Sequence, residues 1–174
     1  MAFDGGFVIV GAVDAGPRVD TAMAAAWVSE DARSWTGTTV DVGPIGGNEF
    51  GRVLAGADGL VAWAGLREGH TGPRFTGSWA SPDGLTWSPA PAPNDLMAAD
   101  GVRVVALGPT AHGEDPNLWP GISEAWASTD GASWTEITVA SELNDFPEGM
   151  WVVPDGVIYA GVQSFWFATA TTSP

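Results

Sequence analysis

The chain of 174 residues contains no cysteine and no lysine, and its six basic residues are all arginine. Without cysteine, neither a disulfide framework nor a thiolate metal site can form. The 21 acidic residues give a formal charge of −15, and such a surface repels phosphate backbones and anionic membranes. We therefore expect neither a nucleic acid nor a membrane as partner.

Long apolar segments are also missing. No stretch approaches the roughly 18 residues that a membrane-spanning helix needs, and residues 1–6 lack the basic and apolar regions of a signal peptide. The sequence thus predicts a soluble chain without an export signal, and its location stays open. A sustained helical period is missing as well, and 24 glycines and 13 prolines interrupt the chain, so we expect no helix.

What the chain does contain is a short motif that occurs three times without gaps, at intervals of about 50 residues. Each copy opens and closes with tryptophan and carries Ser-x-Asp in between. The copies occupy residues 27–35, 79–87 and 126–134. A fourth copy begins at Trp166 and then decays.

Short apolar runs precede each copy, and an Asp-Gly pair or a similar turn stands at the start of each run. Asp-Gly between apolar runs is a strong hairpin signal, because both residues tolerate positive φ. The runs are residues 6–10, 59–63, 101–105 and 156–160. Their expected partner strands are residues 52–55, 96–99 and 150–153.

Repeats of roughly 40–50 residues with four strands each indicate the blades of a β-propeller. We predict an all-β fold, with about four four-stranded blades in a single domain and with ragged terminal blades. The blades are expected near residues 1–42, 48–92, 95–140 and 148–174. The repeats leave open whether these blades close a ring, form half of a larger ring, or belong to a longer protein.

The pattern Ser-x-Asp-x-Gly-x-Ser/Thr-Trp resembles the Asp-box, or BNR repeat, of sialidase-like and related propellers. It covers three blades well and the fourth poorly. The first copy carries Ala32 where glycine is expected, which predicts a distorted turn. The resemblance implies that the boxes are structural and lie on the face away from the ligand site. This structural set comprises Ser29, Asp31, Trp35, Ser81, Asp83, Trp87, Ser128, Asp130 and Trp134.

The residue types of the box fit a turn. A carboxylate can accept backbone N–H bonds, and a serine hydroxyl can add further bonds. Gly84 and Gly131 can supply positive φ, and the closing tryptophans can pack between neighbouring blades.

Candidate ligand-binding residues lie in the long loops between the second and third strands of each blade. Both histidines of the chain fall in such loops, and a His, Glu, Asp and Arg cluster could bind a metal or a carboxylate. The simpler interpretation, which we prefer, is that they are ordinary polar loop residues, with arginines pairing to the surplus acids. The candidates are Arg18, His70, Arg74, His112, Glu114, Asp115 and Trp119, and Trp119 could stack on a sugar or cover its own blade.

Sialidase chemistry is not expected, because the chain lacks the Arg-Ile-Pro motif and its only tyrosine, Tyr159, lies inside an apolar strand. We predict no catalytic residue, no cofactor and no bound metal. The leading hypothesis is a non-enzymatic binding or scaffold module with a carbohydrate or protein ligand. The alternatives are a lectin assembled from partial propellers, and a glycosidase-like hydrolase that uses two of the many carboxylates.

Self-association is expected, because the strands are apolar on both faces and an open arc of blades would leave two such faces in water. Two copies related by a two-fold axis would cover both faces in an eight-blade ring. We therefore favour a homodimer over a closed monomer.

Overall fold

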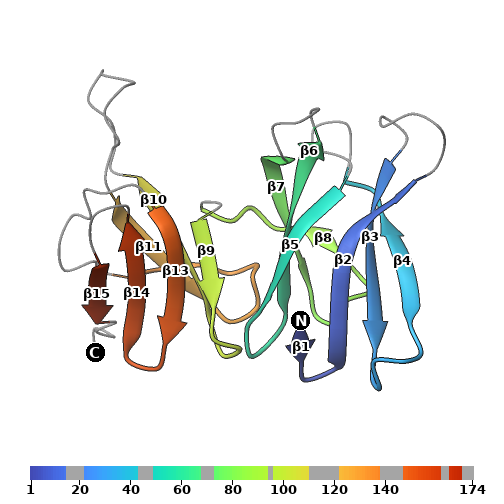
Figure 1. Cartoon of the computed structure of the whole chain (residues 1–174), viewed down its shortest axis with the longest axis horizontal. Helices are drawn as coiled ribbons and strands as arrows, with labels where there is room; N and C mark the ends of the chain where they lie inside the picture. Colours follow the sequence, from blue (N-terminus) through green and yellow to red (C-terminus); the bar gives the residue numbers. More distant parts are fainter. Residues whose placement is uncertain are drawn as a thin grey trace.

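The computed structural model describes residues 1–14, 22–42, 49–67, 73–93, 96–109, 122–137, 147–161 and 165–169. These segments form four antiparallel sheets and contain no helix, as predicted (Figure 1). The first sheet contains β1 (Ala2–Phe3), β2 (Gly6–Asp14), β3 (Ala22–Ser29) and β4 (Thr36–Val40), and the second contains β5 (Glu49–Ala55), β6 (Leu60–Arg67), β7 (Pro73–Ser81) and β8 (Ser88–Pro89). The third sheet contains β9 (Leu96–Ala99), β10 (Val104–Pro109), β11 (Ile122–Ser128) and β12 (Thr135–Ile137), and the fourth contains β13 (Pro147–Val153), β14 (Gly156–Gly161) and β15 (Phe165–Thr169).

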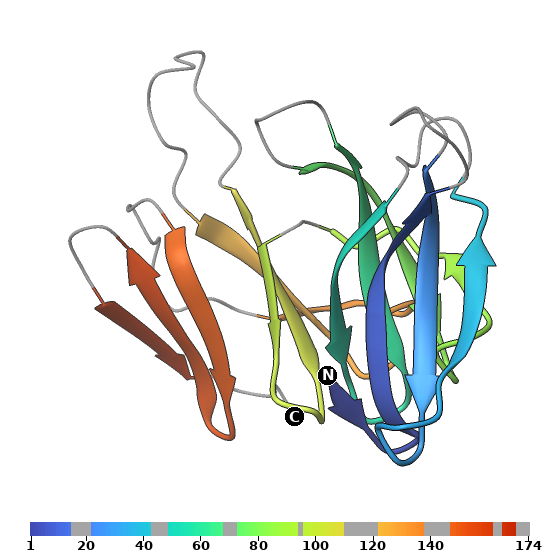
Figure 2. The same ribbon diagram turned by 45° about the vertical axis from the view of Figure 1, so that its right-hand side comes forward.

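Each sheet is a meander, because its strands are neighbours in chain order. Antiparallel order places the first hairpin and the turn after the third strand at the same end of the strands, which we call the hairpin edge. The connection between the second and third strands belongs to the opposite edge. Figure 1 shows the sheets side by side in sequence order, with the hairpins β1–β2, β9–β10 and β13–β14 along the lower edge. In the turned view of Figure 2, the hairpins β1–β2 (dark blue) and β13–β14 (orange) again lie at the lower end of the sheets.

Hairpins form at the predicted Asp-Gly turns, but the third differs in detail. Its second strand, β10, begins at Val104 instead of at residue 101. The Oδ1 atom of Asp100 accepts hydrogen bonds from the amides of Val102 and Arg103, both at 2.9 Å. This side-chain turn holds residues that the apolar pattern assigned to the strand.

The hydrophobic core is divided into three layers, one between each pair of successive sheets. Side chains alternate between the faces of a strand, so Leu60 and Ala62 of β6 pack toward the first sheet while Val61 packs toward the third. The layers contain Val8, Ala24, Leu60 and Ala62 between the first and second sheets, Leu54, Val61, Met97 and Val104 between the second and third, and Val105, Leu107, Val152 and Tyr159 between the third and fourth.

The sheets are also joined along the edge that carries the hairpins. The amide of Ala57, in the turn between β5 and β6, donates to the carbonyl of Val102 at 2.8 Å. The amide of Asp58 donates to the carbonyl of Thr129 at 3.0 Å. Val102 lies in the turn between β9 and β10, and Thr129 lies in the turn between β11 and β12. Since both bonds join these turns to the turn between β5 and β6, the hairpin edges of the second and third sheets lie side by side. The other edge therefore carries the connections between second and third strands.

Candidate functional site

Three repeated aspartate turns, residues 29–34, 81–86 and 128–133, lie at the hairpin edge. In the second of them, Asp83 Oδ1 accepts hydrogen bonds from the amides of Leu85 at 2.9 Å and Thr86 at 2.7 Å. Its Oδ2 atom accepts a bond from Thr86 Oγ1 at 3.1 Å. The Ser81 hydroxyl donates to Asp83 at 3.2 Å and accepts from the amide of Gly84 at 2.7 Å. Both acceptor atoms of the carboxylate are thus used within the turn.

The third aspartate turn repeats this arrangement. Asp130 Oδ1 accepts from the amides of Ala132 and Ser133, both at 2.8 Å. The Ser128 hydroxyl donates to Asp130 at 3.0 Å and accepts from the amide of Gly131 at 2.8 Å. The predicted hydrogen bonds of serine and aspartate are therefore confirmed, as is the positive φ of Gly84 and Gly131, at 77° and 75°.

The first aspartate turn keeps the same backbone despite its alanine. Asp31 accepts from the amides of Arg33 and Ser34, both at 2.8 Å, and from the Ser29 hydroxyl at 3.1 Å. Ala32 adopts a φ of 59° and is the one non-glycine residue with positive φ in the described segments. The expected distortion of this turn is therefore wrong: Ala32 takes up the left-handed conformation, at a cost that glycine does not have.

The hydrogen bonds lower the pKa of each of these carboxyl groups. The amide of Ser133 is the main cause for Asp130, whose pKa falls to about 2 although partial burial opposes the change. For Asp83, partial burial raises the pKa, but the amides of Thr86 and Leu85 together outweigh it, so the pKa is lowered. Carboxylates held ionised by backbone donors stabilise a turn, and these aspartates are accordingly assigned to the fold.

The closing tryptophans divide into two kinds. Trp87 packs in the layer between the first and second sheets, where its ring centroid lies 5.1 Å from that of Phe50 in β5. Its Nε1 atom donates to the carbonyl of Gly84 at 2.9 Å. Trp134 packs in the layer between the second and third sheets. Trp35, by contrast, is 38% exposed. The prediction that all three tryptophans pack between sheets is therefore wrong for Trp35, which has no preceding sheet in the described part of the chain.

Each internal aspartate turn sits on the sheet that precedes it. A Cβ atom added at Gly84 would lie 2.6 Å from Val28 Cγ2 in the first sheet. One added at Gly131 would lie 2.6 Å from Val61 Cβ in the second sheet. These glycines are needed for close approach between sheets as well as for positive φ.

Most of the predicted ligand residues fall outside the described segments. Arg18, His70, His112, Glu114, Asp115 and Trp119 all do so, and their clustering stays a prediction. The backbone of Arg74 is described: it lies in β7, opposite Leu66 of β6. Its assignment to a loop is therefore wrong, because the connection between β6 and β7 is shorter than the sequence indicated.

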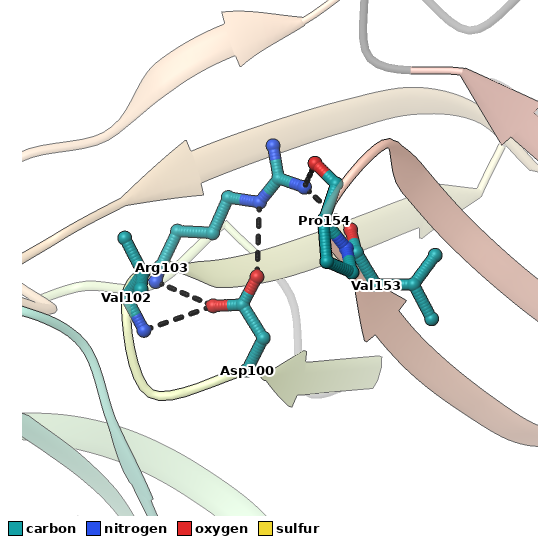
Figure 3. A network of polar contacts seen from close by, with 5 residues as sticks. All are labelled: Asp100, Val102, Arg103, Val153 and Pro154. Carbon is teal, nitrogen blue, oxygen red and sulfur yellow. Dashed lines mark hydrogen bonds and ion pairs between the residues drawn. The ribbon is translucent and has the colours of Figure 1, made fainter.

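An arginine at the hairpin edge of the third sheet links it to the fourth sheet and was missed by sequence reasoning (Figure 3). Arg103 Nη2 donates to the carbonyls of Val153 at 2.7 Å and Pro154 at 3.0 Å, in the turn that joins β13 and β14. Its Nε atom lies 3.4 Å from Asp100 Oδ2. Partial burial raises the pKa of Asp100, and the amides of Arg103 and Val102 together with the guanidinium charge outweigh it and lower that pKa.

Two apolar surfaces remain uncovered at the ends of the row of sheets. The first end face comprises Phe7, Ile9, Met23 and Trp27 on the first sheet. The last end face comprises Trp151, Ile158, Phe165 and Phe167 on the fourth sheet. Sequence reasoning expected uncovered faces in general but singled out no residue of the fourth sheet.

No family model, curated protein or solved structure matches the chain. Within the described segments, no helix is long and apolar enough to cross a membrane. The same segments contain no group of three or more histidine, aspartate or glutamate side chains arranged to hold a metal ion.

Proposed function

We propose that the four sheets are blades of an Asp-box propeller, and that the chain is a non-enzymatic binding or scaffold module. One observation carries this proposal: three equivalent turns at one edge use their aspartates to bind backbone amides. The same hydrogen-bonded aspartate turn occurs once in each of the first three sheets, as expected of an element that stabilises a repeated fold. The carboxylates are thereby engaged in folding, which leaves ligand recognition to the opposite edge.

The proposed ligand edge is the one at which second and third strands are joined. Its connections follow β2, β6, β10 and β14, and they span residues 15–21, 68–72, 110–121 and 162–164. Their unequal lengths and sequences favour a role in specificity, because loops on a repeated scaffold can vary without disturbing the sheets. His70, His112 and Trp119 belong to these connections, and a carbohydrate or a protein segment is the proposed class of ligand.

A glycan array and a panel of chromogenic glycosides test this function. We expect no hydrolysis of any glycoside, and binding, where it occurs, that is lost in Trp119→Ala and His112→Ala. Glu136→Gln, which changes an exposed acid in β12, serves as the control and should bind like the unmodified chain. Turnover of a glycoside would overturn the non-enzymatic assignment. Structure determination with a bound glycan or peptide on the aspartate-turn edge would overturn the ligand edge.

A further inference from the structure

The first end face exposes side chains at strand positions whose equivalents in the second and third sheets are buried. Phe7 is 39% and Ile9 49% exposed. Phe7 pairs with the serine of its aspartate turn, Ser29, just as Leu60 and Val104 pair with theirs. Leu60 and Val104 are both 0% exposed, because the preceding sheet covers them. The first end face is therefore a sheet-docking surface without its sheet.

The last end face is the complementary case. Trp151, Ile158 and Phe167 lie in one row across the fourth sheet, since Ile158 pairs with the other two residues. Trp151 is 53% and Phe167 57% exposed, and the neighbouring Phe165 is 81% exposed. A contiguous aromatic surface of this kind that is exposed to solvent indicates an interaction surface.

Both end faces are bulkier than the internal faces at equivalent positions. In the third sheet, Ala98 and Ala127 pair with Val105, and this row packs against the fourth sheet. The fourth sheet has Trp151 and Phe167 in the places of these two alanines. On the first end face, Ile9 pairs with a tryptophan, as Ala62 and Ala106 do in the internal sheets.

The first aspartate turn is also bulkier than its internal equivalents. Where Gly84 and Gly131 allow the preceding sheet to come close, Ala32 carries a Cβ atom. A sheet docked on the first end face at the internal spacing would meet that atom. The large side chains on both end faces and the Cβ atom of Ala32 each require a wider spacing between sheets than the internal layers have. The two end faces thus match each other better than either matches an internal face.

We propose that a second copy of this chain covers both end faces, with the last end face of each copy packed on the first end face of the other. The contact continues the sheet-on-sheet packing that forms the three internal layers, and two such junctions close a two-chain ring. With a charge of −15 on each chain, apolar burial drives the association against electrostatic repulsion. Added salt screens that repulsion and therefore strengthens the dimer.

Sedimentation and light scattering on the whole chain test the assembly. The unmodified chain should have the mass of two 17.9 kDa chains, with a dimer fraction that rises with sodium chloride concentration. Ile9→Glu and Phe165→Glu should each weaken dimerisation by at least about 100-fold, because each buries an unpaired carboxylate in an apolar junction. Val102→Glu makes the same change at a residue that is 61% exposed outside the end faces and should leave the mass unchanged.

A mixture of the two end variants identifies which faces meet. Ile9→Glu keeps an intact last end face and Phe165→Glu an intact first end face, so the mixture should form a heterodimer through one junction while each variant alone stays monomeric. A contact between two identical faces would leave one variant dimeric by itself and would overturn the proposal. A monomeric unmodified chain would do the same. Should Ile9→Glu not melt cooperatively, Met23→Glu, at a residue that is 41% exposed on the same face, replaces it.

Discussion

Gly131 of the third aspartate turn lies directly against Val61 of the second sheet, where an added Cβ atom would stand 2.6 Å from the Val61 Cβ atom. Its φ of 75° independently disfavours any side chain. A turn that is local in sequence is therefore also a contact between sheets, and its glycine serves both purposes.

Gly131→Ala should lower the free energy of unfolding by about 1–3 kcal/mol, because the methyl group overpacks the junction and the φ is unfavourable. The reciprocal change, Ala32→Gly, removes a residue held at a φ of 59° in a turn that meets no preceding sheet in the described segments. It should raise the free energy by up to about 1 kcal/mol. Urea denaturation measures both changes. Equal effects of the same sign would contradict the contact argument.

Asp83→Ala and Asp130→Ala should each lower the free energy of unfolding by about 1–3 kcal/mol, because two backbone amides lose their acceptor. Asp31→Ala should have a smaller effect, since its turn is exposed and packs on no other sheet within the described segments. Chemical denaturation of the three variants under the same conditions provides the comparison. If all three variants unfold at the same denaturant concentration as the unmodified chain, the structural role of the turns is refuted.

Acid should destabilise the fold through the same carboxylates. The folded-state pKa of Asp130, about 2, is lower than that of an unfolded aspartate, about 3.9. The stabilisation is therefore complete above about pH 5 and is lost as the pH falls through 4 toward 2. Asp130→Asn keeps an oxygen acceptor but does not titrate, so it should reduce the dependence of stability on pH in this window. Denaturation series at pH 7, 5, 4 and 3 measure the two slopes, and identical slopes would argue against the assignment.

The turns could be predicted from the sequence because their hydrogen bonds join residues two or three positions apart. A strand such as Leu96–Ala99 was likewise foreseen with the observed bounds, since its hairpin is local. Burial depends on which sheet lies alongside, which no local pattern records. For this reason Trp35 is exposed although its motif matches those of Trp87 and Trp134, which are partly buried.

The candidate ligand edge was less predictable than the turns. Arg74 was placed in a loop because Gly-Pro precedes it, yet proline is compatible with the first position of a strand, and Pro73 begins β7. The long-range bond from Arg103 to Val153 joins residues 50 positions apart, so it could be found only once the third and fourth sheets were seen together.

Arg103 should make a measurable contribution to the docking of the fourth sheet. Its guanidinium supplies one donor atom to two carbonyls of the turn between β13 and β14 and pairs with Asp100. Arg103→Ala leaves those carbonyls without a charged donor and should lower the free energy of unfolding by about 1–2 kcal/mol. Arg103→Lys should recover less than half of this loss, because an ammonium cannot reproduce the planar arrangement of the guanidinium donors.

Hydrogen exchange separates this local effect from a general one. Amide protection should fall most in β13 and β14 of Arg103→Ala, since the turn that joins these strands loses its hydrogen bonds from the third sheet. Asp100→Asn keeps the oxygen that accepts from the amides of Val102 and Arg103 but removes the charge of this partly buried ion pair, and it should cost about 1 kcal/mol or less. Arg33→Ala, an equal change of charge at an exposed position, is the control and should leave protection in the fourth sheet unaltered. Uniform loss of protection across all four sheets in Arg103→Ala would mean that the arginine stabilises the chain as a whole and does not fasten one sheet to the next.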